Sequence, residues 1–474
     1  MTCHCRPIGR DIQPILAALV VFAVQAAWPT AVVAQSSIGV TTVRPFVVSV
    51  IPVVNGGVVG GVSVDVEGVL SRSEPDAIGS LRAARRQALK QMGDDVAQPS
   101  KLRKISLRGL EAAIDKRRQT GERATDEMLY LAGVWRLRYV FVYPERNDIV
   151  LAGPAEGWKV GVEGEAVGIR SGEPMLRLDD LVVALRWAAA SLGGEMISCS
   201  IDPEPDGIRR VQNLLRRGRL QANVAAVEAL RDRLGPQRVT ITGVLPGSHF
   251  ARVMVAADYR MKRLAMGLDP SPVEGLPSYM DLLSENPRAA HGRIMPRWWL
   301  APRYEPMLRD ESGLAWELRG PGVEVRAGAT AFSRDGSRDP TLKARGPSQQ
   351  WAEAFTERYE AVATELPVFA RLRNCMDLAV LAALVASADL GSVAGYGMPL
   401  LSDEAAVAIP AFPVPRTVES EVSFVRAGRS WIVSISGGVE MDGNSVLERV
   451  ERGDGPASAR SQAAAAAAGR WWWD

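Results

Sequence analysis

The sequence predicts an α+β protein with mixed helices and short sheets in two or three subdomains. Three observations support this fold class. Short runs rich in β-branched residues, typical of strands, are interspersed with longer segments whose apolar residues recur every three or four positions, typical of helices. Hydrophobic residues make up 47% of the 474 residues and charged residues 23%, as in ordinary globular proteins. No internal repeat indicates a solenoid.

The same composition excludes collagen-like, fully disordered and disulfide-dense chains. The formal net charge is +2, without the basic surplus that is typical of nucleic-acid-binding proteins. We therefore expect no nucleic-acid partner.

Residues 1–34 have the pattern of a secretory signal peptide. Two arginines precede the apolar run 15–27, and small residues at 32–34 precede a cleavage site before Gln35. The run is shorter than the roughly 20 apolar residues of a membrane span, and an uncleaved anchor is the alternative. We expect an exported protein of the periplasm, the cell envelope or the extracellular space, with no transmembrane span after cleavage.

Cleavage would leave two cysteines, Cys199 and Cys375. In an oxidising compartment they are able to form a disulfide, and the alternative is two buried thiols. These cysteines and the histidines His249 and His291 lack the spacing of a structural zinc site. The sequence therefore predicts neither a metal site nor a cofactor.

An extended, β-rich arm is predicted for residues 35–75, which are rich in Val and Gly. The runs 46–51 and 62–66 have the composition of strands, and paired glycines between them mark turns. The glycines lack the spacing of a nucleotide-binding loop. We expect the arm to pair with a sheet elsewhere in the chain.

Residues 76–190 are predicted to hold a helical segment and a hairpin. Apolar residues recur at helical spacing over 76–133, and the opposite face is basic between residues 82 and 108. We expect that face to be solvated, and a contact with acidic polymer or anionic lipid is the alternative.

Two apolar runs, 139–143 and 149–151, are separated by a turn and predict the hairpin. A helix then begins after Asp179 or Asp180. Paired aspartates invite an acid–base interpretation. At a helix start we interpret them as capping residues and as partners of the helix dipole.

Residues 191–330 are predicted to form an α/β core in the order strand, helix, helix, strand, helix over 195–265. The second strand, 239–245, turns at Pro246–Ser248 into a helix that has a continuous apolar face. Strands and long loops follow, and residues 331–350 are predicted to be a flexible linker.

Residues 351–452 are predicted to form helices and a C-terminal hairpin. An amphipathic helix runs from 351 to 366, and the apolar stretch 376–388 indicates a buried core helix. Residues 453–474 have low complexity and are predicted to be disordered. The terminal Trp471, Trp472 and Trp473 would dock either on the protein body or on a membrane interface.

The strongest candidate site is Ser248-His249, at the turn from strand to helix. The nucleophile pattern G-x-S-x-G is absent, and adjacent residues do not easily adopt triad geometry. We therefore interpret Ser248 as the helix N-cap and predict no catalytic residue. The alternative is an anion- or ligand-binding site in which His249 and Arg252 assist the free backbone N–H groups.

Two weaker signals concern carbohydrates. The carboxylates of Glu163 and Glu165 fit a glycosidase in principle. Trp298, Trp299 and Tyr304 have rings that stack on sugars, although packing in a core or an interface is the expectation for them.

Several stretches resemble a family of exported bacterial proteins from planctomycetes, the domain-of-unknown-function family numbered 1598. The most specific is 249–283, HFARVMVAADYRMKRLAMGLDPSPVEGLPSYMDLL. Further similar stretches start at Leu102 and span 139–158, 197–203 and 373–378. The resemblance implies an exported envelope or secreted protein. It implies no activity, and so no catalytic residues.

These observations favour a non-enzymatic cell-envelope or interaction protein whose partner is an envelope protein or polymer. The alternative is a hydrolase or ligand-binding enzyme that acts on an envelope polymer and uses the helix start at Ser248.

Overall fold

The structure is a computed structural model, and the residues that it describes belong to one compact unit within 43–474. They are residues 46–47, 59–65, 67–73, 93–161, 163–191, 196–217, 223–286, 294–332, 338–343, 346–424, 431–432, 436–463 and 470–474. The predicted signal peptide, the basic residues at 82–86 and most of the alanine run near the C-terminus lie outside them.

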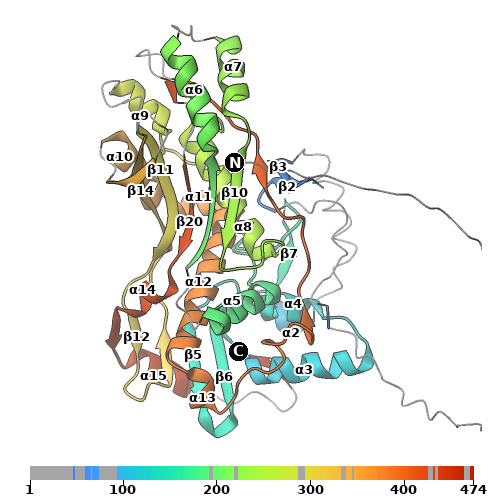
Figure 1. The fold of residues 1–474 in the computed structure, drawn as a ribbon. Coiled ribbons are helices and arrows are strands. Elements are labelled where there is room, and N and C mark those ends of the chain that lie inside the picture. The colour runs from blue at the N-terminus through green and yellow to red at the C-terminus, as the bar shows by residue number, and fades with distance from the viewer. Residues whose placement is uncertain are drawn as a thin grey trace, which may run out of the picture. The chain divides into compact units, whose positions relative to one another are not determined.

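Helices and sheets coexist in this unit, which confirms the α+β fold class (Figure 1). A nine-stranded sheet has the order β15-β14-β11-β20-β9-β10-β17-β3-β2. Its pairs are antiparallel except for β11 with β20 and β17 with β3. The strands are β15 (Arg338–Lys343), β14 (Gly322–Phe332), β11 (Ile294–Arg303), β20 (Ser436–Met441), β9 (Ile197–Pro203), β10 (Gln237–Thr242), β17 (Thr417–Val418), β3 (Val69–Arg72) and β2 (Val62–Val64).

A seven-stranded sheet has the order β21-β12-β13-β5-β6-β4-β22, and β12 with β21 is its one parallel pair. Its strands are β21 (Val450–Arg452), β12 (Met307–Arg309), β13 (Ala315–Glu317), β5 (Tyr139–Tyr143), β6 (Asp148–Ala155), β4 (Ser100–Ser106) and β22 (Trp472–Trp473). The strands β5 and β6 form the predicted hairpin. Three small pairs complete the strands: β1 (Phe46–Val47) with β16 (Val407–Ala408), β7 (Trp158–Val160) with β8 (Ala166–Gly168), and β18 (Ser423–Phe424) with β19 (Trp431–Ile432).

The helices include the three that build the candidate site: α5 (Leu178–Ser191), α8 (His249–Ala265) and α12 (Pro367–Ser387). The helix α8 packs against β9 and β20, and α12 packs against both α5 and α8. The other helices are α2 (Asp94–Ala97), α3 (Leu107–Thr120), α4 (Asp126–Leu129), α6 (Pro205–Arg217), α7 (Val224–Leu234), α9 (Tyr279–Glu285), α10 (Pro347–Glu357), α11 (Tyr359–Glu365), α13 (Leu390–Ala394), α14 (Gly443–Leu447) and α15 (Gly455–Gln462), with the 3-10 helices η1 (Leu131–Gly133) and η2 (Pro144–Arg146).

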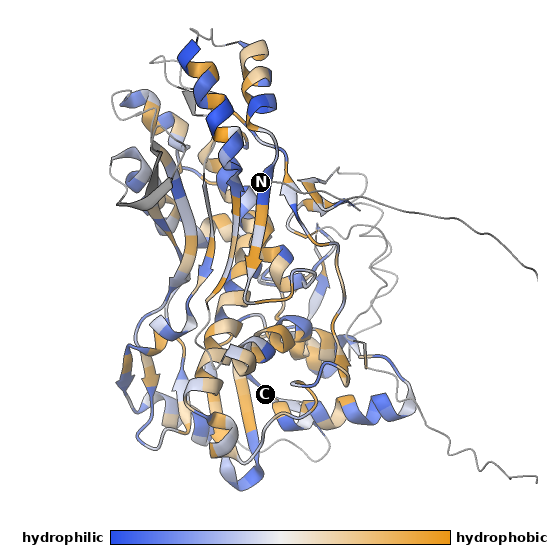
Figure 2. Cartoon of the chain, in the orientation of Figure 1, coloured by the Kyte–Doolittle hydropathy of each residue, from blue (hydrophilic) through white to orange (hydrophobic). Residues whose placement is uncertain are grey.

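The elements differ in hydropathy (Figure 2). The helix α3 is mostly hydrophilic along its length, whereas β5 and β6 are mostly hydrophobic. The helix α12 begins with Pro367 at its first turn, where the missing N–H costs nothing. It is buried over most of its length, as the apolar stretch 376–388 predicted. No helix in the described part of the chain combines the length and apolar character needed to cross a membrane.

The described part of the N-terminal arm pairs with a sheet, as predicted. The strand β2 forms an antiparallel hairpin with β3, and β3 joins β17 in parallel. Phe46, Val62 and Val64 are buried in the core, so the arm contributes apolar contacts as well as hydrogen bonds.

The helical prediction for 76–133 is wrong at residues 100–106, which form the strand β4. The basic residues at 101–104 therefore lie on a strand and not on a helical face. Of these, Arg103 and Lys104 are buried. Arg103 is accommodated because backbone carbonyls and the carboxylate of Asp474 accept its N–H groups.

The prediction of a disordered tail is wrong for residues 453–463 and 470–474. The former include α15, and in the latter β22 pairs antiparallel with β4. Trp471 and Trp472 are buried. These two tryptophans therefore dock on the protein body, which is one of the two alternatives that the sequence left open. The predicted linker 331–350 likewise contains β15, which pairs with β14, and the start of α10.

Candidate functional site

Ser248 caps α8, which confirms its interpretation as the N-cap. Its hydroxyl accepts a hydrogen bond from the backbone N–H of Ala251 and donates one to the carbonyl oxygen of Leu245, at 3.1 and 2.7 Å. The hydroxyl is thus engaged on both sides by the backbone around the turn. This arrangement does not favour Ser248 as a nucleophile.

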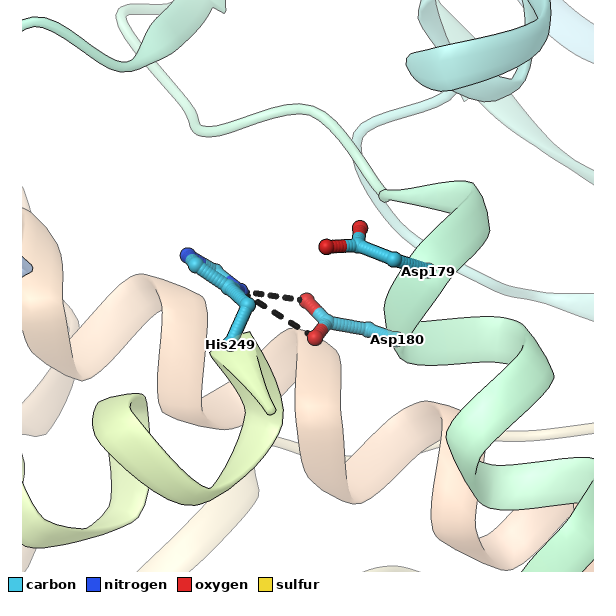
Figure 3. Close-up of side chains that lie close together, drawn as sticks. All are labelled: Asp179, Asp180 and His249. Carbon is cyan, nitrogen blue, oxygen red and sulfur yellow. Dashed lines mark hydrogen bonds and ion pairs between the residues drawn. The ribbon is translucent and has the colours of Figure 1, made fainter. Parts of the chain in front are cut away.

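His249 projects from the start of α8 toward the first turn of α5 (Figure 3). Its Nδ1 lies 2.9 and 3.1 Å from the two carboxylate oxygens of Asp180. Both side chains are buried. Burial raises the pKa of Asp180 to about 7, although Arg177 and Arg371 act in the opposite direction.

Asp179 lies beside this pair, and the guanidinium of Arg177 donates to both of its carboxylate oxygens, at 2.8 and 2.7 Å. Each of Asp179, Asp180 and His249 offers a ligand atom within 4.8 Å of the others, a geometry that is able to hold a metal ion. Sequence reasoning assigned the two aspartates to the helix start only. It missed their meeting with His249 because α5 and α8 are far apart in sequence and only their packing brings the three residues together.

A small cavity of about 20 Å³ adjoins the cluster. That volume holds about one water molecule or an ion, and it is too small for a sugar ring. Its lining includes charged groups of both signs and side chains from α5, α8 and α12. The lining residues are Tyr130, Glu165, Ala166, Pro174, Met175, Arg177, Asp180, His249, Arg371 and Asn374.

Arg252 lies one helical turn after His249 on α8 and does not belong to the cluster of possible metal ligands. It is fully buried, and its Nη1 donates to the carbonyl oxygen of Pro413 at 3.3 Å. Burial lowers the pKa of Arg252 to about 10. Because His249 faces the carboxylate of Asp180, its surroundings do not favour an anion. The anion site at Ser248, His249 and Arg252 stays a prediction, which the carboxylate of Asp180 beside His249 does not favour.

Cys199 on β9 and Cys375 on α12 are buried free thiols. Of the two alternatives, a disulfide and a pair of buried thiols, the structure shows the second. Burial raises the pKa of each thiol well above its ordinary value. Both are therefore held as protonated, poorly reactive side chains.

The residues weighed for carbohydrate chemistry mainly have packing roles. Trp298 is fully buried against Trp351, and the hydroxyl of Tyr304 donates to Asp377. Trp299 is partly exposed, and Arg297 stacks on it at 5.4 Å.

A second candidate site is a groove of about 580 Å³ beside β10. The strand β17 pairs with β10 only at Gln237 and Arg238, whereas β9 pairs with β10 along its whole length. Beyond the bond from the N–H of Val239 to the carbonyl oxygen of Arg416, the two segments separate, and they meet again where the N–H of Phe412 donates to the carbonyl oxygen of Gly247. We call this the β10 groove. It is lined by Glu204, Pro236, Arg238, Val239, Thr240, Ile241, Pro246, Val414, Pro415, Arg416 and Thr417.

Comparison with known families gives a match over part of the chain. A family model described as a protein of unknown function, DUF1598, matches residues 199–279. The match supports the unknown-function domain that the resemblance indicated, and it spans β10, α8 and both Ser248 and His249. No curated protein and no solved structure matches the chain.

Proposed function

We propose that this chain is an exported, non-enzymatic protein of the cell envelope that binds a partner protein through the β10 groove. The single observation that carries the proposal is the unpaired edge of β10 at Ile241. Backbone groups along an antiparallel strand point alternately to the two sides. Because the N–H of Val239 faces the groove, the N–H and C=O of Ile241 face it as well.

An unpaired strand edge is a template for an added strand, and many domains recognise extended peptides in this way. Ile241 pairs with Cys199 of β9 on one side of β10, but no strand in the described part of the chain pairs with it on the side of the groove. Val239 and Ile241 provide apolar contacts. Arg238 pairs with Glu204 at 2.8 Å, so Arg416 gives the lining one positive charge in excess. These features favour an extended segment that carries an acidic residue.

The hydrolase alternative has weaker support. The hydroxyl of Ser248 is engaged by the backbone, and the cavity beside His249 has only about 20 Å³. A polymer substrate would need a larger, open cleft at the reacting groups.

Export rests on the sequence of residues 1–34 and on the resemblance to exported planctomycete proteins. Mass spectrometry of the protein from fractionated cells would test it. We expect a mature chain that starts at Gln35 in the envelope or the medium. A chain that retains residues 1–34 in the cytoplasm would contradict export.

Site-specific photo-cross-linking in intact cells tests the groove. A photoreactive amino acid at Thr240 or Val414, both in the groove, should yield one reproducible cross-linked protein. The same amino acid at Val224 or Val393, which are exposed elsewhere, serves as the matched control. Equal products at all four positions, or no product at the two groove positions, would contradict the proposal.

A further inference from the structure

The cluster of Asp179, Asp180 and His249 brings together two carboxylates and one imidazole from two helices. All three side chains are buried, and their ligand atoms lie within 4.8 Å of one another. Carboxylate oxygens and imidazole nitrogens are ligands for divalent cations such as Zn²⁺. Figure 3 shows that Asp179 and Asp180 project from the same side of α5, toward His249.

Asn374 on α12 supplies an independent observation that points to a ligand. It lines the cavity beside Asp180 and His249 and is only 6% exposed. Its amide nitrogen donates to the carbonyl oxygen of Pro174 at 2.9 Å, which fixes the orientation of the amide. Its Oδ1 is buried and accepts no hydrogen bond from the described residues. A buried acceptor without a donor is costly unless a water molecule or an ion satisfies it.

The charges around the cavity favour a cation. Asp179 and Asp180 belong to the cluster, Glu165 lines the cavity, and Glu163 pairs with Arg371. Arg177 pairs with Asp179 and, at 4.0 Å, with Asp180, and Arg371 pairs with Glu163. A divalent cation bound to Asp179 and Asp180 would compensate these two buried carboxylates, and buried charges need such compensation.

We propose that Asp179, Asp180 and His249 bind one divalent transition-metal cation of the Zn²⁺ class, and that the amide oxygen of Asn374 completes its ligand shell. The cation joins α5, α8 and α12 at one point and so has a structural role. This site is separate from the β10 groove, and it does not depend on the proposed partner.

Calorimetric titration of the purified, EDTA-treated full chain with Zn²⁺ tests the proposal. We expect one ion per chain. Asp180→Asn and His249→Gln should each weaken binding by about 100-fold or more, because loss of an outer-shell partner alone typically costs about 10- to 100-fold. Asn374→Ala should weaken it by about 10-fold.

Asp377→Asn is the matched control, since Asp377 is a fully buried carboxylate on α12 outside the cluster. It should retain one ion at unchanged affinity. X-ray absorption at the zinc edge of the wild-type chain needs no variant to fold. It should show nitrogen and oxygen at about 2.0–2.2 Å and no sulfur at about 2.3 Å. A chain that binds no Zn²⁺, variants that bind as the wild type does, or a sulfur ligand would overturn the proposal.

Discussion

Arg103 shows how one side chain holds distant parts of the chain together. It is fully buried on β4 and donates to the carbonyl oxygens of Val96, Ala132 and Gln98 at 2.7–3.0 Å. It also donates to both carboxylate oxygens of Asp474, at 2.7 and 3.1 Å. Its guanidinium thus replaces the water that these oxygens would otherwise bind.

Replacement of this residue, Arg103→Met, should lower the free energy of unfolding by about 3 kcal/mol or more, because it leaves several acceptors without donors. Urea denaturation measures the change. The exposed ion pair of Arg238 with Glu204 provides the control, and Arg238→Met should change stability by less than about 1 kcal/mol. Equal losses in the two variants would contradict this account of Arg103.

Asp258 links stability to pH. It is fully buried and pairs with Lys262 at 2.9 Å. Burial raises the pKa of Asp258 to about 6. Between pH 4 and 6 the folded chain therefore retains a proton that the unfolded chain has released, so the stabilisation by this proton is lost as the pH rises through 6.

Asp258→Asn removes this titration. The stability of the wild type relative to this variant should fall by about 2 kcal/mol between pH 4 and 6.5 and stay nearly level above that pH. Urea denaturation at a series of pH values measures the difference. A difference that grows with pH would show that the carboxyl is stabilised in its charged form.

At the scale of the elements, β22 shows that the end of the chain belongs to the fold. It pairs with β4 through Trp472↔Ile105 and Trp473↔Lys104. Trp472 is buried in the main core, whereas Trp473 is partly buried against a second, smaller cluster. Two adjacent tryptophans thus occupy opposite faces of the seven-stranded sheet.

Trp472→Ala should destabilise the chain by about 3–5 kcal/mol, as expected for a large side chain lost from a core. Trp473→Ala is the matched control and should cost clearly less, because its side chain is less buried. Thermal and urea denaturation of both variants would check this order. A reversed order would mean that the tail docks in another register.

The elements that the sequence predicted well are those with a long, regular pattern. The helix α8 follows from its apolar periodicity, the hairpin of β5 and β6 from two apolar runs on either side of a turn, and the second half of α12 from the continuous apolar stretch 376–388. The strand β4 did not follow, because its charged residues are satisfied by groups that only the tertiary fold supplies. The tail failed for a similar reason, since its order depends on a strand more than 350 residues away.

At the scale of the whole molecule, both large sheets combine strands from distant parts of the sequence. In the nine-stranded sheet β3 near the N-terminus pairs with β17, and in the seven-stranded sheet β4 pairs with β22. Pairings of this kind leave no local signal. The N-cap role of Ser248 is local and could be predicted from the sequence. The contact between Asp180 and His249, and the part of β10 that β17 leaves unpaired, depend on long-range packing and could not be predicted.

The central claim, that the open edge of β10 accepts a partner strand, is tested most directly by amide hydrogen exchange at Ile241. The rate would be measured in the isolated chain and with a synthetic peptide of the cross-linked partner segment. We expect rapid exchange in the isolated chain and exchange slowed by about 10-fold or more with the peptide, because the added strand accepts this N–H. A peptide that binds while the rate at Ile241 stays unchanged would contradict the claim.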